Sequence, residues 1–391
     1  MPGTLGRNGA FSISSDRGNA INHSSLVAPR LEIDLDKIFL NASKLVEKLG
    51  KRNVSVTGVT KAALGSPSIA NAWLQAGVDG LGDSRIENIE TIRGGNISTS
   101  VTLIRSPMLS QVDQVVRLAD VSCNTELAIV KALSAAARKA DRSHGIILMV
   151  ELGDLREGIM PELLEGFVAE TLRLPNLNFE GIGANLACRS GVSPDSKNMA
   201  VLSALADKID ATFGTIVTTV SGGNSANLNW ALSGVDTGRI NNLRLGEALL
   251  LGREPLHRQA LDELHTDAIT LIAEVIESKI KPTQPWGEIA QAAFGETRPK
   301  KNTGSIIQSI LAIGRQDIDP SGLDAPLGIS ILAASSDHLI IDSSKYRRSL
   351  KVGDPIPFQL NYSALLRAMT SPFITKVTKR SNRFPKSLQP N

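Results

Sequence analysis

Short apolar runs alternate with longer amphipathic segments through the first two thirds of this 391-residue chain. The segment 30–35 alternates as a strand does, and apolar residues at helical spacing follow in 34–51, where Asp36 is placed to cap a helix. Helical segments long enough to cross back over a sheet separate the strand-like runs after this point. Eight runs have the character of buried strands: 54–60, 77–83, 101–105, 120–124, 145–152, 179–187, 215–223 and 241–246.

The count of these units predicts the architecture. Eight strand–helix units in about 220 residues indicate a closed parallel (β/α)8 barrel of the TIM type, which we place at 29–255. An open doubly wound α/β sheet is the alternative, but the count of eight and the lack of GxGxxG after the first run favour the barrel. Beyond it, β-like runs broken by Pro, Gly and Asp predict a mainly β domain at 256–385. The strand at 30–35 is a candidate member of that β domain.

Composition narrows the class of protein. Lys and Arg (42) exceed Asp and Glu (39) by 3, and no basic run is interleaved with aromatics, so no nucleic-acid partner is expected. No apolar stretch approaches the roughly 20 residues of a membrane helix, and no signal-peptide core is present. Residues 1–28, rich in Gly, Ser and Asn, indicate a flexible leader. Cys123 and Cys188 are too few for a disulfide framework or a metal cluster, which predicts a cytoplasmic enzyme without a metal.

The ends of three predicted strands carry candidate chemistry. Lys61 follows the first barrel strand, where a desolvated lysine could form a Schiff base; the alternative is a lysine that only extends to solvent. The Gly-rich turn 221–225 follows the seventh strand, and Arg244 and Gly246 end the eighth. Loops at these positions of a barrel commonly bind phosphate. The order of lysine, phosphate loop and arginine suits pyridoxal 5'-phosphate.

With these features the sequence resembles the alanine racemase family of barrel-type pyridoxal-phosphate enzymes, and most closely its ornithine racemase-like branch. The resemblance extends over about residues 30–370 and implies the barrel, the β domain and the cofactor. It rests on the motifs EIDLDKIFLN, VTKA, GDSRIENIE, VELGDLREG, GIGANL, SGGNS, RLGEALLLGRE and ASSDHLIID.

The resemblance implies a role for each matching residue. Lys61 is the Schiff-base lysine, and once released it moves the α-proton of the substrate. Arg156 would donate to the phenolic oxygen of the cofactor; its alternative is an ion pair with Glu157 or Asp154. Arg244 would face the pyridine nitrogen, where its permanent charge opposes protonation and favours return of the proton to Cα.

Further positions are implied around the phosphate and at a subunit interface. Tyr362 would reach the phosphate from the β domain, although a tyrosine packed in the domain core is the alternative. Asp337 would belong to the active site of the opposite subunit, which implies a homodimer with shared sites. The phosphate-side positions, with Glu247 acting through its backbone N–H, are Ser221, Gly222, Gly223, Asn224, Gly246 and Glu247.

Three positions depart from the family pattern. Arg315 stands where a catalytic tyrosine is expected; it cannot act as an ordinary base but could bind a substrate carboxylate. Gly65 replaces a tyrosine four residues after the lysine, and Asn185, a cofactor-side position, replaces a histidine. An alanine racemase proper is therefore not expected.

Racemisation requires proton transfer on both faces of the reacting carbon, and Lys61 serves only one face. The candidates for the other face are Cys188 and His338, the latter beside Asp337. Each has a simpler structural interpretation, the cysteine as a small buried hydrophobe.

These observations predict a pyridoxal-phosphate-dependent amino-acid racemase, acting on ornithine or another basic amino acid. Asp154 or Glu157 could pair with the distal ammonium of such a substrate. Two alternatives are kept: a pyridoxal-phosphate carrier or homeostasis protein, and a decarboxylase or lyase on the same scaffold. The β domain argues against the carrier, because the carriers have a single domain.

Overall fold

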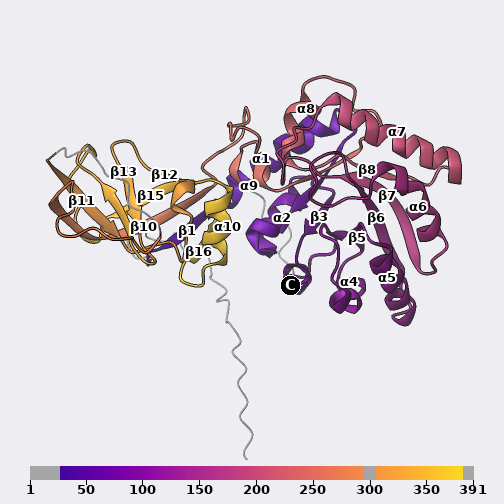
Figure 1. Ribbon diagram of the computed structural model, residues 1–391, viewed down its shortest axis with the longest axis horizontal. Helices are drawn as coiled ribbons and strands as arrows, with labels where there is room; N and C mark the ends of the chain where they lie inside the picture. Colours follow the sequence, from indigo (N-terminus) through magenta and orange to yellow (C-terminus); the bar gives the residue numbers. More distant parts are fainter. Residues whose placement is uncertain (1–26, 295–303, 382–391) are drawn as a thin grey trace, which may run out of the picture.

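Eight parallel strands close into a barrel on one side of the molecule (Figure 1), as β2 pairs with β9 to complete the ring. The computed structural model describes residues 27–294 and 304–381. The predicted leader therefore lies almost wholly outside the described residues, as does the predicted end at residue 385. The barrel strands are β2 (Ser55–Val59), β3 (Gly80–Asp83), β4 (Val101–Leu103), β5 (Val121–Asn124), β6 (His144–Val150), β7 (Leu177–Ala184), β8 (Thr219–Ser221) and β9 (Asn242–Leu245).

Helices follow the strands and form the outer layer of the barrel. Among the helices of the described ranges, none has both the length and the apolar composition needed to cross a membrane. The α-helices are α1 (Leu35–Gly50), α2 (Pro67–Gln75), α3 (Ile86–Gly94), α4 (Val112–Leu118), α5 (Leu127–Lys139), α6 (Leu164–Leu172), α7 (Ser196–Phe213), α8 (Leu228–Leu232) and α9 (Glu247–Leu251). Short 3₁₀ turns are η2 (Lys61–Ala63), η3 (Leu109–Gln111), η4 (Pro161–Leu163), η5 (Ser225–Asn227) and η6 (Pro320–Gly322).

Helix α1 begins one residue earlier than its predicted cap. The side chain of Asp34 accepts hydrogen bonds from the backbone N–H groups of Asp36 and Lys37, each at 3.1 Å. The prediction of Asp36 as N-cap is wrong, because the strand ends at Asp34 and leaves Asp36 in the first helical turn. There its charge is still favourable toward the helix dipole.

The remaining strands form a largely antiparallel sheet beside the barrel. Strand β1 pairs with β10 and, in parallel, with β16, so the strand predicted at 30–35 lies in this sheet and joins two distant parts of the chain. The fold class is thus confirmed, whereas the bounds 29–255 and 256–385 stay a prediction. The elements of this sheet domain are β1 (Arg30–Asp34), β10 (Ile269–Pro282), β11 (Ser305–Leu311), β12 (Leu323–Asp324), β13 (Ser330–Ala334), β14 (Leu339–Asp342), β15 (Pro355–Leu360), α10 (Tyr362–Thr370) and β16 (Thr375–Lys379).

One helix of the sheet domain connects it to the barrel. Helix α10 is capped by Asn361, whose side chain accepts from the N–H of Ala364 at 3.0 Å. It lies against η2, the turn that follows the first barrel strand. Active-site residues of such barrels lie at the C-terminal ends of the strands. The contact between α10 and η2 therefore places residues of the sheet domain at that end of the barrel.

Candidate active site

Lys61 opens the turn η2, directly after the first barrel strand. The preceding residue, Thr60, donates its hydroxyl hydrogen to the carboxylate of Asp83 at 2.7 Å. Asp83 is fully buried at the end of β3 and also accepts from the side chain of Asn88 and the N–H of Arg85, each at 3.0 Å. Through Asp83, the GDSRIENIE motif therefore fixes the position of Thr60 and of the backbone that leads into Lys61.

The amine of Lys61 has no hydrogen bond or ion pair with any residue of the described ranges. Its Nζ lies over the ring of Tyr362, 5.6 Å from the ring centroid. Burial lowers the pKa of Lys61, although the acidic groups of Cys188 and Asp83 partly oppose this. A desolvated, unpaired lysine is a stronger nucleophile at neutral pH than an exposed one.

Gly65 explains why the tyrosine expected four residues after the lysine is missing. Its φ is +68°, and a Cβ there would lie 2.2 Å from the carbonyl oxygen of Asn88. The η2 turn is therefore pressed directly onto the backbone of α3. No side chain fits at this position without moving the segment that carries Lys61.

Arg244 lies inside the barrel and is 5% exposed. One end of its guanidinium donates to the carbonyl and hydroxyl oxygens of Ser221; the other donates to the carbonyl of Ala184 at 2.7 Å and to Asn185 Oδ1 at 3.2 Å. Asn185 also accepts from the amide of Asn224 at 3.2 Å. The structure thus brings together four of the predicted cofactor-side residues, Asn185, Ser221, Asn224 and Arg244.

The turn after β8 differs from its expected role in one respect. The N–H of Gly222 donates to Asn242 at 2.9 Å, and the N–H of Asn224 donates to the side chain of Asn227 at 3.1 Å, so neither is free for a ligand. The hydroxyl of Ser221 points into the barrel rather than to the mouth. The N–H of Gly223 and the hydroxyl hydrogen of Ser225 have no acceptor among the described residues and remain available.

Ser225 and the start of α9 form a small group of donors. The Ser225 side chain is buried and accepts from the N–H of Ala248 at 3.2 Å, and its own hydroxyl hydrogen has no acceptor among the described residues. The N–H of Glu247 stands in the first turn of α9, after Gly246, where it has no intrahelical partner. We call Ser225, Gly246, Glu247 and Tyr362 the anion cup.

Glu247 and Tyr362 influence each other within this cup. Burial raises the pKa of the Glu247 carboxyl to about 7, opposed by Arg258, whose guanidinium lies 4.0 Å away. Burial, followed by the negative charge of Glu247, raises the pKa of Tyr362 above its usual value. Tyr362 is therefore a hydrogen-bond donor at neutral pH, and its hydroxyl has no acceptor among the described residues.

The loops after β6 and β7 are joined by Asp154. Its buried carboxylate accepts from the N–H groups of Cys188 at 3.0 Å, Arg189 at 2.8 Å, Ser190 at 3.1 Å and Val192 at 3.4 Å. Although burial works against it, these donors lower the pKa of Asp154. These four backbone N–H groups occupy both oxygens of the Asp154 carboxylate, which contradicts the expectation that it could bind a substrate ammonium.

Arg156 and Cys188 lie at the same loops. The guanidinium of Arg156 forms a two-pronged ion pair with Glu157, which is the alternative arrangement foreseen for it. The thiol of Cys188 is 3.5 Å from the side-chain nitrogen of Asn224, and partial burial raises its pKa, so it is protonated at neutral pH. Cys188 and Lys61 each influence the pKa of the other, so the two groups lie in one region.

Arg315, Asp337 and His338 form a separate group in the sheet domain. The Nδ1 of His338 is 3.1 Å from the carboxylate of Asp337, and Arg315 donates to the carbonyl of Ala334 at 3.2 Å. Within the described ranges, none of their hydrogen bonds or ion pairs reaches the barrel. Among the described residues, no hydrogen bond or ion pair joins these three predicted residues to Lys61.

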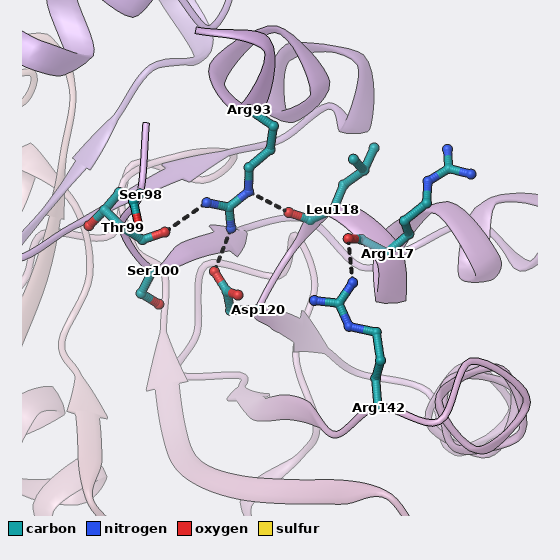
Figure 2. A pocket seen from close by; sticks show the side chains of 8 residues that line it. All are labelled: Arg93, Ser98, Thr99, Ser100, Arg117, Leu118, Asp120 and Arg142. Atoms are coloured by element: carbon teal, nitrogen blue, oxygen red, sulfur yellow. Dashed lines mark hydrogen bonds and ion pairs between the residues drawn. The ribbon is translucent and has the colours of Figure 1, made fainter. Parts of the chain in front are cut away.

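A hollow lies at the end of the barrel opposite to Lys61 (Figure 2). Its volume is about 510 Å³, and its lining residues include Asp120 and Arg142, which precede β5 and β6. Arg93 donates there to Asp120 at 2.6 Å and to the carbonyl of Thr99 at 2.8 Å, and Arg142 donates to the carbonyl of Arg117 at 2.8 Å. Arg93 thus links the segments that precede β4 and β5, and Arg142 links the segment that precedes β6 to the end of α4.

A parallel barrel with an appended sheet domain is a fold that this chain shares with solved structures. Alanine racemase from Clostridium difficile 630 matches with a TM-score of 0.69 at 18% identity, over 91% of this chain and 97% of that chain. D-threonine aldolase from Filomicrobium marinum also matches with a TM-score of 0.69, at 15% identity over 88% and 90%. At these identities the likeness shows the fold.

The chain belongs to the alanine racemase N-terminal domain family, which matches residues 33–254, more than half of its length. It is 38% identical to an ornithine racemase from Acetoanaerobium sticklandii, over 89% of this chain and 99% of the relative. It is 36% identical to a lysine racemase from Thermotoga maritima, over 91% and 100%. The predictions of the family and of an amino-acid racemase are confirmed.

Sequence reasoning missed three residues of the site. Asp83 lies in the GDSRIENIE motif, but only the structure shows that its buried carboxylate accepts hydrogen bonds from Thr60 and Asn88. Ser225 was named only as the end of the turn 221–225. Asn242 gave no signal, because its partners lie on two other strands.

Proposed function

We propose that this racemase uses pyridoxal 5'-phosphate and acts on a basic amino acid, ornithine or lysine. The observation that supports the cofactor is the state of the Lys61 amine at the mouth of the barrel. This amine is desolvated and has no ion-pair partner among the described residues. The two relatives named for ornithine and lysine racemisation support the substrate class.

The residues present fit this cofactor by their chemistry. Lys61 offers the amine for its aldehyde, and Arg244 offers a permanent charge for its ring nitrogen. The anion cup offers hydroxyl and N–H donors for its phosphate, with no lysine or arginine needed. When bound, pyridoxal phosphate draws electrons from the substrate and so acidifies its α-hydrogen.

The proton-transfer roles follow from what each group can do. Lys61 Nζ removes or returns the α-proton on one face, because its lowered pKa leaves part of the amine unprotonated. For the other face we keep both candidates: Cys188 on the barrel's own loop and His338 on the sheet domain. His338, with Asp337 and Arg315, would have to come from the partner of a homodimer, which we propose as the assembly.

The substrate's distal ammonium is assigned to Glu157. Asp154 is used by four backbone N–H groups, so of the two carboxylates predicted for this role only Glu157 remains. Glu157 pairs with Arg156 and can share its oxygens with a second cation. In a Glu157→Gln variant we expect the preference for lysine over norleucine to fall, while an unchanged preference would contradict this assignment.

Both cysteines are free thiols, one buried and one exposed. A protein with an unpaired exposed thiol is suited to a reducing compartment, and we propose the cytoplasm.

The decisive experiment uses the purified protein loaded with pyridoxal phosphate. We expect a visible absorption band from lysine-bound cofactor that disappears in Lys61→Ala, together with inversion and α-deuteration of L-ornithine and L-lysine in D₂O. A bound cofactor without inversion or deuteration would support the carrier, and release of CO₂ or an aldehyde would support a lyase. No bound cofactor in the wild-type protein would refute the proposal.

A further inference from the structure

The inside of the barrel contains a column of polar side chains below Arg244. Asn242 on β9 lies between two neighbours, pairing with Ser221 on β8 and with Ser55 on β2. Its Oδ1 is 2.6 Å from the hydroxyl of Ser221, and its Nδ2 is 3.1 Å from the hydroxyl of Ser55 and 3.0 Å from that of Thr57. Such positions in parallel barrels are more commonly filled by branched apolar residues.

The guanidinium of Arg244, at the top of this column, determines which group donates in each hydrogen bond below it. Arg244 can only donate, so the oxygen of Ser221 must accept from it. The single hydroxyl hydrogen of Ser221 is then left for Asn242 Oδ1, and the amide NH₂ of Asn242 is directed to Ser55 and Thr57. The column therefore holds Arg244 in one orientation from below.

The column also holds Arg244 without neutralising its charge. All four acceptors of the guanidinium are uncharged oxygens, from Ser221, Ala184 and Asn185. In the described ranges no carboxylate lies within ion-pair distance of Arg244. An aspartate at position 242 would have nearly the same shape as asparagine but would place a negative charge two hydrogen bonds away from the guanidinium, with only the Ser221 hydroxyl between them.

We propose that Asn242 is a positioning residue that determines reaction type: its neutral amide fixes Arg244 through Ser221 and keeps the guanidinium fully positive. This inference rests on the proposed pyridoxal-phosphate function, in which Arg244 lies against the ring nitrogen. An uncompensated positive charge keeps that nitrogen unprotonated and limits electron withdrawal into the ring. The proton then returns to Cα, and transfer of the amino group to the cofactor is suppressed.

The test is Asn242→Asp, with Asn241→Asp as matched control. Asn241→Asp adds the same charge at the residue just before β9, where the asparagine side chain accepts from the N–H of Val220 and donates to the carbonyl of Thr218. Loaded proteins are incubated with L-ornithine, and two products are counted per inversion: the keto acid and pyridoxamine phosphate, which together account for the transferred amino group. Cofactor affinity and the absorption spectrum are recorded for each variant.

In Asn242→Asp we expect amino-group transfer per inversion to rise by about tenfold or more, equivalent to ~1.4 kcal/mol between the two barriers. Asn241→Asp should keep the wild-type ratio. Ser221→Ala removes the hydroxyl that connects Asn242 to Arg244 without adding charge, and it should lower kcat with little change in KM. This second variant keeps the test decisive if Asn242→Asp does not fold.

The inference is overturned if Asn242→Asp loads cofactor and keeps the wild-type ratio, or if Ser221→Ala keeps the wild-type kcat. A ratio that rises equally in Asn241→Asp would also overturn it, since general charge would then be responsible. Failure of the wild-type protein to bind the cofactor is a different result, because it would refute the proposed function itself.

Discussion

Ser225 provides the sharpest test of the anion cup. Its hydroxyl oxygen accepts from the N–H of Ala248, while its hydrogen has no acceptor among the described residues and is available to a phosphate oxygen. We expect Ser225→Ala to weaken binding of pyridoxal phosphate. Ser221→Ala, at the other end of the same turn, removes a hydroxyl that points into the barrel.

The magnitude follows from the type of bond that is lost. A hydrogen bond to a charged group contributes about 1.5–3 kcal/mol, which corresponds to about a 10- to 150-fold increase in Kd. Removing Ser225 also leaves the N–H of Ala248 unpaired, which costs about 1–3 kcal/mol of folding stability. In Ser221→Ala the Kd should change by less than about threefold, because no bond to the phosphate is removed.

The assay is a titration of apoprotein with pyridoxal phosphate, followed by the quenching of tryptophan fluorescence. Repeating it with pyridoxal, which lacks the phosphate, separates the cup from the rest of the site. Ser225→Ala should match the wild-type affinity for pyridoxal. The reasoning is refuted if Ser225→Ala binds pyridoxal phosphate as tightly as the wild type, or if Ser221→Ala loses more affinity than Ser225→Ala.

Three further predictions concern stability and the loops. Gly65→Ala should lower the free energy of unfolding by about 1–3 kcal/mol in urea denaturation, because the new Cβ meets the backbone of Asn88 at a positive φ; an unchanged midpoint would contradict this. Asp154→Asn should speed amide hydrogen exchange at residues 188–192 at pH 7, where the wild-type carboxylate is ionised, and unaltered exchange would show that the loop is held otherwise. Burial lowers the pKa of His144 to about 4, so the unfolded chain binds more protons between about pH 6.5 and 4. The contribution of His144 to the free energy of unfolding should therefore fall by about 3 kcal/mol as the pH drops from about 6.5 to 4. Because Glu247 titrates with the opposite sign in the same window, the test is the difference in stability between wild type and His144→Gln, which should change by that amount between the two pH values, and a constant difference would contradict it.

Much of the fold follows from local patterns in the sequence. The eight barrel strands lie within the predicted runs or within two residues of them, because buried strands in a parallel sheet need continuous apolar segments and the helices between them need an apolar stripe. Lys61 was found for the same reason, since a residue just after a barrel strand must stand at the barrel mouth. The capping residue of α1 was missed by two positions, because both Asp34 and Asp36 suit that role and only the end of the strand decides between them.

The sequence by itself determined the class of fold, the family and the lysine, all of which depend on short-range pattern or on motifs of adjacent residues. Only the tertiary structure decided which serine of one turn faces the cup, because that depends on the side of the strand to which each residue is directed. It also showed that Asp154 is used by a loop and that Asn242 holds Arg244. Asn242 meets Ser55 across 187 residues of sequence, and such a contact exists only once the barrel has closed.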